Sequence, residues 1–344
     1  MRAAVGVYLV DFSSLIRPQA YWYTHRAALP WLPLEALFRG VAAGRRWAYR
    51  TGVLPSFSLG VPVVVVGNLS VGGTGKTPLV IAIVKALQRA AYTPGVITRG
   101  YGGRAQSWPR PVTPDSDPAL VGDEPVLIAR HCQCPVVAAP DRVAAGRALL
   151  GQHACNVIVT DDGLQHYRLK RDVEIVVVDG ARGFGNGHCL PAGPLREPVS
   201  RLQRVDFVVA NGEPRAGGVG MTLSGDTAIS CVDVSRKSPL NDFLPQPVHA
   251  VAGIGNPERF FGHLEAAGLR LVRHVFPDHH RFAARDLRFD DDLPVLMTEK
   301  DAVKCRAMVT DRHWYVPVQA ELDAGFFPRL LDSIQSALPT HNVS

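Results

Sequence analysis

A run of four valines followed by a glycine-rich loop constrains this chain most strongly. The β-branched residues at 63–66 are typical of a buried parallel strand, and a helical pattern runs from Leu79 to Ala91 after the loop. A strand, a glycine-rich loop, Gly-Lys-Thr and a helix together make up the phosphate-binding P-loop. The loop residues expected to bind nucleotide phosphates are Ser70, Gly72, Gly73, Thr74, Gly75, Lys76 and Thr77.

The residue types in this loop match the chemistry of phosphate binding. Glycines let the backbone curl so that successive N–H groups point at phosphate oxygens, and the helix N-terminus adds partial positive charge there. Lys76 is expected on the β- and γ-phosphates and the Thr77 hydroxyl on Mg²⁺. Ser70 stands where the strict motif has glycine, but serine is small and compatible with a turn. The alternative is a plain glycine-rich turn, which the flanking strand and helix disfavour.

Strands and helices alternate from residue 61 to residue 225. Predicted strands cover 61–66, 95–98, 136–139, 156–160, 173–178 and 206–210, with helical runs between several of them. This alternation predicts an α/β fold of the P-loop NTPase type, with a doubly wound, mostly parallel sheet. Ligands of such sheets bind at the carboxyl ends of the strands. Residues 61–225 are therefore predicted to form a nucleotide-binding domain.

A second, smaller αβ domain is expected after a change in composition. Residues 226–247 combine turn residues, a short alternating run and three prolines, which predicts a linker. Residues 248–344 then begin a new αβ pattern, with strands at 248–254, 269–276, 295–298 and 314–318. One helix is expected at 257–267, and a final helix is expected to end at about residue 338.

Residues 1–60 are basic and aromatic. Residues 1–50 carry seven arginines against two acidic residues, nearly all of the formal net charge of +6, and three of the five tryptophans lie in this region. A helix predicted over 33–50 has Leu34, Leu37, Phe38, Val41 and Ala48 on one face and arginines on the other. This composition is typical of a helix lying on an anionic membrane. A helix packed on its own protein, with arginines in water, explains it as well.

Bulk composition excludes several other classes. The remaining 294 residues are close to neutral, so charge gives no indication of nucleic-acid binding. The six cysteines form no Cys-x-x-Cys pair and are interpreted as ordinary thiols. No apolar stretch reaches the ~18–20 residues needed to span a bilayer. The apolar start of the chain is cut short by Asp11 and is not interpreted as a signal peptide.

Charged residues outside the P-loop supply further candidates. Asp161 and Asp162 end a predicted strand, the arrangement that holds Mg²⁺ beside a P-loop; two turn aspartates are the simpler interpretation. Asp123 opens a helix and is either an N-terminal cap or a carboxylate that accepts a proton from an attacking hydroxyl.

Two more segments carry charged pairs. Arg196 and Glu197 lie in a proline-rich loop. Arginine is suited to binding phosphate, and glutamate to the surroundings of a metal ion. The alternative is a surface ion pair of little energetic value. His279 and His280 follow Asp278, and an aspartate-oriented histidine is a plausible base or relay, although histidine pairs are more often structural.

Further motifs join these along the chain. In order they are Val66-Gly67-Asn68, Gly72-Gly73-Thr74-Gly75-Lys76-Thr77-Pro78, Thr98-Arg99-Gly100-Tyr101-Gly102-Gly103, Gly122-Asp123-Glu124-Pro125, Asp161-Asp162-Gly163, Gln165-His166, Pro191-Ala192-Gly193-Pro194-Leu195-Arg196-Glu197, Asp278-His279-His280 and Thr298-Glu299-Lys300-Asp301. This ordered set resembles the tetraacyldisaccharide 4′-kinase family, the lipid A 4′-kinases of Gram-negative bacteria. Leu164 stands where an aromatic residue is commoner, and residues 1–15 lie outside the resemblance.

The resemblance implies an enzyme that transfers the ATP γ-phosphate to the 4′-hydroxyl of a tetraacylated glucosamine disaccharide 1-phosphate. It implies Asp123 as catalytic base with His279 as its partner, and Asp161, Asp162 and Glu197 as the acidic Mg²⁺ set. Arg196 would contact phosphate. It also implies a two-stranded linker between the domains and a helix within residues 16–50 resting on the cytoplasmic face of the inner membrane. No nucleic acid and no obligate protein partner is implied.

Other P-loop classes fit less well. A switch ATPase with a deviant P-loop would have lysine where Val71 stands, although a membrane-associated switch ATPase stays an alternative. A GTPase would have Asn-Lys-x-Asp after a strand, of which Thr298-Glu299-Lys300-Asp301 is a partial match. A soluble small-molecule kinase would share the nucleotide site, and the dependence of its activity on lipid would distinguish it.

Overall fold

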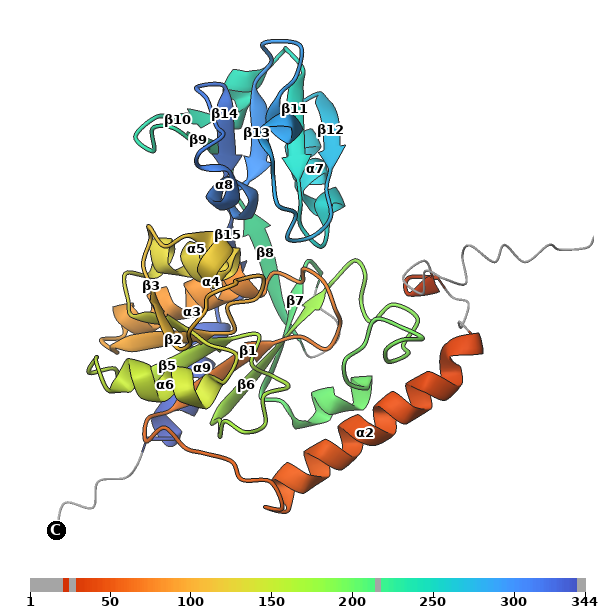
Figure 1. Ribbon diagram of the computed structural model, residues 1–344, viewed down its shortest axis with the longest axis vertical. Coiled ribbons are helices and arrows are strands. Elements are labelled where there is room, and N and C mark those ends of the chain that lie inside the picture. The colour runs from red at the N-terminus through yellow and green to blue at the C-terminus, as the bar shows by residue number, and fades with distance from the viewer. Residues whose placement is uncertain (1–20, 25–28, 214–217, 339–344) are drawn as a thin grey trace, which may run out of the picture.

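The computed structural model describes residues 21–24, 29–213 and 218–338. Residues 1–15, expected to be an extra N-terminal piece, and residues 16–20 and 25–28 of the predicted membrane region lie outside this description. Two sheets stand one above the other (Figure 1), and the long helix α2 (Leu32–Arg50), preceded by η2 (Leu29–Trp31), runs along the lower edge. No helix among the described residues is long and apolar enough to cross a membrane.

The larger sheet has nine strands in the order β15-β8-β7-β6-β1-β5-β2-β4-β3. All neighbours from β8 to β4 are parallel, and only the outermost strands β15 and β3 are antiparallel. The strands are β1 (Val63–Gly67), β2 (Pro94–Thr98), β3 (Arg110–Val112), β4 (Val136–Ala138), β5 (Val157–Asp161), β6 (Val173–Asp179), β7 (Phe207–Asn211), β8 (Val219–Ser224) and β15 (Gln319–Leu322).

Both faces of this sheet are buried, which explains the unbroken valine run of β1. Val64 and Val66 face one hydrophobic cluster, and Val63 and Val65 face another. Helices α3, α5 and α9 supply the first cluster and α6 the second. The elements that cover the sheet are α3 (Lys76–Arg89), α4 (Pro118–Val121), α5 (Asp123–Cys132), α6 (Arg142–Leu150), η3 (Val199–Arg204) and α9 (Phe326–Ser336).

The smaller sheet has six strands in the order β10-β9-β14-β13-β11-β12, with β14, β13, β11 and β12 parallel. Helix α7 packs on one face and α8 on the other. The elements are β9 (Thr227–Ser230), β10 (Lys237–Pro239), η4 (Leu240–Phe243), β11 (Val248–Ala252), α7 (Pro257–Ala266), β12 (Leu271–Val275), η5 (Ala284–Leu287), β13 (Val295–Thr298), α8 (Glu299–Cys305) and β14 (His313–Val316).

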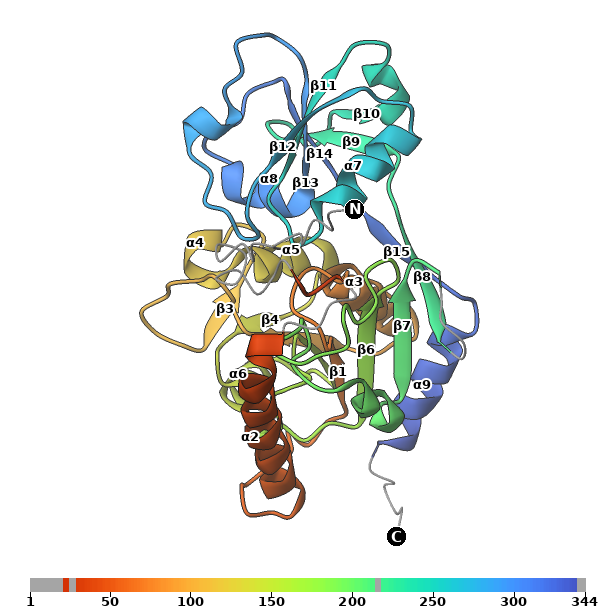
Figure 2. The same cartoon turned by 90° about the vertical axis from the view of Figure 1, so that its right-hand side faces the viewer.

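Two segments belong to other parts of the fold than the sequence predicted. Residues 226–247, interpreted as a linker, contain β9 and β10 of the smaller sheet. Within 248–344, β15 and α9 return to the larger sheet, where β15 pairs with β8 and Phe326 packs edge-on against Phe207 at 5.4 Å between ring centroids. The chain therefore crosses between the sheets along the neighbouring strands β8 and β15 (Figure 2).

Helix α2 packs on the larger sheet through a partly polar face. The buried Glu35 carboxylate lies 2.7 Å from His188 Nδ1 and accepts a bond from the Cys189 N–H at 2.9 Å. Phe38 packs against the second cluster of the larger sheet. The other long apolar side chains of the predicted hydrophobic face point away from the protein; these are Leu34, Leu37 and Val41, exposed by 48%, 65% and 64%.

Candidate functional site

A cleft of about 430 Å³ lies between the two sheets, where the P-loop follows β1. Its floor is the P-loop from Val71 to Pro78, and its other wall comes from the β11–α7 turn and the start of α8. Parallel strands of the larger sheet end at this cleft, the position expected for a ligand in an open α/β sheet. The cleft therefore joins the phosphate-binding motif to residues of the smaller sheet.

The P-loop has the conformation that its sequence predicts. Gly75 has a φ of +94°, and a Cβ there would lie 2.4 Å from the Asn211 side-chain nitrogen, so glycine is required. Asn211 donates to the Thr74 carbonyl at 3.1 Å and fixes the loop from β7. Residues 72–77 line the cleft, whereas the buried Ser70 pairs with Leu195 and is not among the lining residues.

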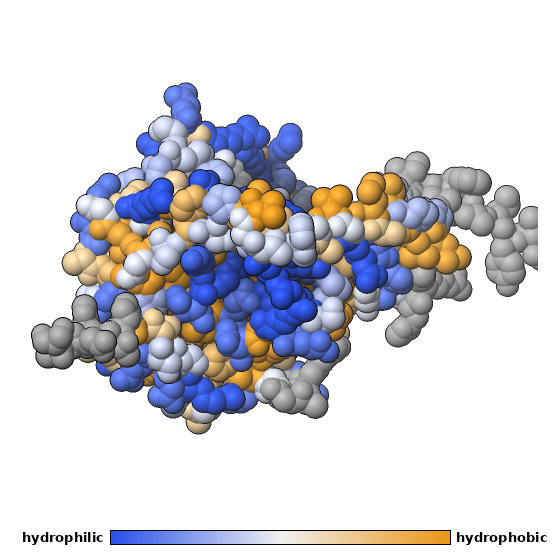
Figure 3. Space-filling view, turned by 90° about the horizontal axis from the view of Figure 1, so that it is seen from below, coloured by the Kyte–Doolittle hydropathy of each residue, from blue (hydrophilic) through white to orange (hydrophobic). Residues whose placement is uncertain are grey.

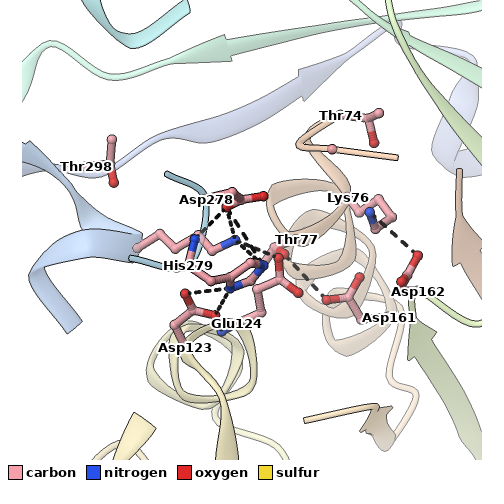
Figure 4. Close-up of polar contacts among 12 residues, drawn as sticks. Thr74, Lys76, Thr77, Asp123, Glu124, Asp161, Asp162, Asp278, His279 and Thr298 are labelled. Atoms are coloured by element: carbon pink, nitrogen blue, oxygen red, sulfur yellow. Dashed lines mark hydrogen bonds and ion pairs between the residues drawn. The ribbon is translucent and has the colours of Figure 1, made fainter. Parts of the chain in front are cut away.

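The strand-end aspartates meet the P-loop (Figure 4). Thr77 Oγ1 lies 3.4 Å from Asp161 Oδ2, and Lys76 Nζ lies 3.6 Å from Asp162 Oδ1. Arg196 Nη1 donates to both Asp162 oxygens at 3.0 and 3.1 Å. Burial raises the pKa of Asp162, but Lys76 and then Arg196 outweigh it and hold that pKa at about 2. Asp162 is therefore ionised and orders two cations around the phosphate position.

Asp161 fits the role of a magnesium ligand. Its carboxylate is fully buried, and its Oδ1 atom has no hydrogen-bond partner among the described residues. Burial, with Glu124 adding to it, raises the pKa of Asp161 to about 7. A cation would stabilise the ionised form of such a carboxylate, and Mg²⁺ in nucleotide sites is commonly held by one or two protein oxygens together with the phosphates. No cluster of three or more His, Cys, Asp or Glu side chains that could hold a metal occurs in the described part of the chain.

Glu197 lies away from the cleft. Its side chain is 2% exposed, and its Oε2 atom is 2.6 Å from the Tyr167 hydroxyl, 3.3 Å from Arg46 Nη1 and 3.5 Å from Arg201 Nε. Arg46 belongs to α2, so in this arrangement Glu197 holds α2 against the loop that carries Arg196. The structure therefore does not bring the Glu197 carboxylate beside Asp161 and Thr77, where it would be the third carboxylate of the predicted acidic set.

Asp123, at the start of α5 on the larger sheet, and His279, in the loop after β12 of the smaller sheet, meet beside the cleft (Figure 4). Asp123 begins α5, and His279 Nδ1 lies 3.1 Å from its Oδ2. Burial raises the pKa of Asp123, but Lys300, His279 and Lys304 together lower it to about 2. His280 instead contacts Asp286 at 3.0 Å and the rings of Phe276 and Phe282. Of the two adjacent histidines, His279 is therefore the one placed beside the candidate base.

Sequence reasoning gave no role to two cations of the site. Arg142, 2% exposed, donates from Nη2 to the Asp162 carbonyl at 3.0 Å and so shapes the turn after β5. Lys300 lines the cleft and lies 3.0 Å from Glu124 Oε1. The Thr-Glu-Lys-Asp motif at the end of β13 was a signal for Lys300, whereas nothing local distinguishes Arg142 from other helix-start arginines.

The fold and the cleft define a P-loop phosphotransferase, with the Asp123–His279 pair beside the cleft that the P-loop lines. The family described as tetraacyldisaccharide-1-P 4′-kinase matches residues 27–335. The chain belongs to this family, and it is a kinase, as its sequence predicts.

Curated relatives and a solved structure agree with this assignment. A tetraacyldisaccharide 4′-kinase from Nitrosococcus oceani is 53% identical over 95% of this chain and 96% of its own length. Another from Alkalilimnicola ehrlichii is 52% identical over 88% of this chain and 91% of its own length. The crystal structure of an "apo" form of LpxK from Aquifex aeolicus in complex with ATP superimposes with a TM-score of 0.75 at 26% identity, covering 90% of this chain and 99% of that one.

Proposed function

We propose that this protein transfers the γ-phosphate of ATP to the 4′-hydroxyl of a tetraacylated glucosamine disaccharide 1-phosphate, a step of lipid A biosynthesis. The observation that carries the proposal is a P-loop that lines the same cleft as His279, whose Nδ1 contacts the neighbouring Asp123 carboxylate. Membership of the 4′-kinase family supports the choice of acceptor. The proposal needs neither nucleic acid nor a second protein.

Residues of this chain supply the positioning and charge that phosphoryl transfer requires. The P-loop N–H groups, Lys76 and Arg196 bind the phosphates. Asp123 takes the proton of the acceptor hydroxyl as the new oxygen–phosphorus bond forms and the bond between the β-phosphate oxygen and the γ-phosphorus breaks, releasing ADP. Thr77 and Asp161 would hold Mg²⁺, which neutralises phosphate charge when bound. Glu197 would act indirectly, by holding the loop that carries Arg196 through its contacts with Tyr167 and Arg46.

We further propose that the protein works at the cytoplasmic face of the bacterial inner membrane as a peripheral protein. An acceptor with four acyl chains leaves a bilayer only at a cost of about 0.8 kcal/mol per CH₂, so the enzyme must reach the membrane. Helix α2 suits this contact because Leu34, Leu37 and Val41 are exposed on one side of it. Seen from below (Figure 3), hydrophobic residues lie along the ridge that α2 forms.

The test is transfer of labelled γ-phosphate from Mg-ATP to a tetraacyl disaccharide 1-phosphate in detergent micelles. Labelling of the lipid by the native protein, and its loss in Lys76→Ala, is the expected result. ATP hydrolysis without labelled lipid would overturn the proposal in favour of a switch ATPase. Labelling of soluble sugars in preference to the lipid would indicate a soluble small-molecule kinase instead.

A further inference from the structure

A short N-terminal segment, residues 21–24, lies against the loop that follows β6. The Asn186 N–H donates to the Trp22 carbonyl at 2.8 Å, and the Asn186 side-chain amide donates to the Tyr21 carbonyl at 3.3 Å. The Trp22 indole N–H donates to the Pro191 carbonyl at 3.1 Å. These bonds hold the segment, which precedes η2 and α2 in the chain, at one place on a loop of the larger sheet.

The same loop reaches the smaller sheet through Arg182. Its Nη1 atom donates to the Gly255 carbonyl at 2.6 Å. Gly255 belongs to the β11–α7 turn, which packs so closely on the P-loop that a Cβ on Gly255 would lie 2.3 Å from the Gly73 nitrogen. A hydrogen bond from a charged donor is stronger than one between neutral groups, so Arg182 is well placed to hold this turn against the P-loop.

Tyr23 of the N-terminal segment contacts the same guanidinium. The Arg182 Cζ atom lies 5.3 Å from the centroid of the Tyr23 ring. A guanidinium over an aromatic face is attracted to the ring and is also oriented by it. Tyr23 is 44% exposed and Arg182 is half-buried, and both lie outside the set of described residues that line the cleft. The contact from Tyr23 therefore reaches the cleft wall through Arg182.

Asp179 holds the β11–α7 turn and α7 from the same side. Its Oδ1 atom accepts from the Arg182 N–H at 3.1 Å, and its Oδ2 atom accepts from Asn256 Nδ2 at 3.0 Å and pairs with Arg259 Nη2 at 2.8 Å. Asn256 and Arg259 both line the cleft. The turn after β6 thus holds the cleft wall with a carboxylate and with a guanidinium, and Tyr23 stacks on the guanidinium.

We propose that Arg182 is a positioning residue, which holds the β11–α7 turn on the P-loop in the arrangement that binds ATP, and that Tyr23 couples the N-terminal segment to this arrangement. Without the contact, the turn would leave the P-loop for part of the time. The apparent affinity for ATP would then fall with the fraction of molecules that stay competent, whereas saturating ATP would restore the arrangement. By linkage, docking of the segment and binding of ATP each favour the other.

The test uses four variants of the full-length protein. Tyr23→Ala removes the ring, Arg182→Met removes the guanidinium, and the double variant removes both. Arg236→Met is the matched control, because it removes a guanidinium that lies 5.3 Å from the Trp314 ring within the smaller αβ unit. Titration calorimetry gives the Kd for a non-hydrolysable ATP analogue, and steady-state kinetics give kcat and the KM for ATP separately.

Arg182→Met is expected to raise the Kd and the KM for ATP by about tenfold, with kcat at saturating ATP within about twofold of the native value. Tyr23→Ala should raise both constants by about threefold, although its side chain lies outside the cleft. The double variant should bind no more weakly than Arg182→Met, because Tyr23 acts through the guanidinium. Arg236→Met should bind the analogue as the native protein does.

Four results would overturn the inference. Native affinity in either single variant would remove that residue from the coupling. Effects that add in the double variant would make Tyr23 and Arg182 independent of each other. A fall in kcat with an unchanged Kd would place Arg182 in the chemical step, and an equal loss of affinity in Arg236→Met would make the effect a general loosening. Calorimetry does not depend on the acceptor, so it decides the inference even if labelling of the lipid fails.

Discussion

At the scale of single residues, the site combines positions that local sequence reveals with positions that it conceals. Lys76, Thr77 and Asp161 follow from a motif and a strand end, because their neighbours in sequence are also their neighbours in space. The partners of Glu197 are Tyr167, 30 residues away, and Arg46, 151 residues away. No local pattern could predict that this glutamate would pair with the N-terminal helix instead of facing the cleft.

The role of Asp123 gives a prediction at this scale. Asp123→Asn keeps the size of the side chain and can still contact His279, but it removes the proton acceptor. We expect kcat to fall by about 10²–10⁴-fold, with little change in the KM for ATP, because Asp123 does not line the nucleotide cleft. Steady-state kinetics at saturating lipid measure both constants. Retained turnover would leave Asp123 as a helix-start residue only.

A second prediction concerns the close approach of two loops. A Cβ on Gly255 would lie 2.3 Å from the backbone nitrogen of Gly73, so Gly255→Ala must push the β11–α7 turn away from the P-loop. Overpacking of this kind costs about 1–3 kcal/mol, and we expect the Kd for a non-hydrolysable ATP analogue to rise by about tenfold or more. Titration calorimetry measures it.

Gly262→Ala is the matched control for that substitution. Gly262 lies in α7, and nothing lies within 4 Å of the position of its Cβ. We expect unchanged nucleotide affinity and a gain in stability of about 0.5–1 kcal/mol, because alanine favours the helix. Equal affinities of the two variants and the native protein would show that the turn and the P-loop do not depend on their contact.

At the scale of elements, sequence periodicity predicted the helix at α2 and the side chains that share a face. It could not predict what that face covers, because the partners of α2 come from distant loops. The polar Glu35 and Arg46 anchor the helix, through Cys189 and Glu197 respectively, while three of the five predicted apolar residues stay exposed. The exposed side chains Leu34, Leu37 and Val41 can therefore contact another surface. A helix that buried its whole apolar face against its own protein could not make such a contact.

This arrangement predicts that membrane binding and folding can be separated. Leu37→Gln together with Val41→Gln should leave stability within about 0.5 kcal/mol, because both side chains are largely exposed. Binding to vesicles of anionic lipid should weaken by about tenfold or more, since burying one such side chain contributes about 1.5–3 kcal/mol. Vesicle co-sedimentation and urea unfolding measure the two effects.

Phe38→Ala is the control for the α2 variant because Phe38 packs inward on the larger sheet. It should lower stability while its effect on vesicle binding stays small. If the Leu37 and Val41 double variant binds vesicles as tightly as the native protein, the exposed side of α2 is not the membrane contact.

At the scale of the whole molecule, the alternation of strands and helices was enough to predict two αβ units but not where the chain passes between them. The strands β9 and β10 lie in the proline-rich segment interpreted as a linker, because strands of three or four residues carry a weak sequence signal. The return of β15 and α9 to the larger sheet depends on pairing with β8, about a hundred residues earlier, which periodicity does not report. The relative placement of the two sheets, and with it the cleft, therefore depends on contacts between residues that are far apart in the sequence.

The contacts between the sheets lead to a last prediction. The buried Asp179, at the end of β6, accepts from Asn256 Nδ2 at 3.0 Å and pairs with Arg259 Nη2 at 2.8 Å. In Asp179→Ala both partners lose their carboxylate, and the buried amide is left without that bond, at a cost of about 1–3 kcal/mol. We expect hydrogen exchange of the α7 amides to accelerate by about tenfold or more without nucleotide.

The control for that measurement disturbs the smaller sheet alone. Asp291→Ala removes the 2.9 Å contact with His249, and both of these residues belong to the smaller αβ unit. If α7 exchange rises only in Asp179→Ala and returns to the native rate with an ATP analogue, Asp179 holds the sheets together before nucleotide binds. Equal exchange in the two variants would place the loosening within the smaller sheet and leave the cleft walls independent of Asp179.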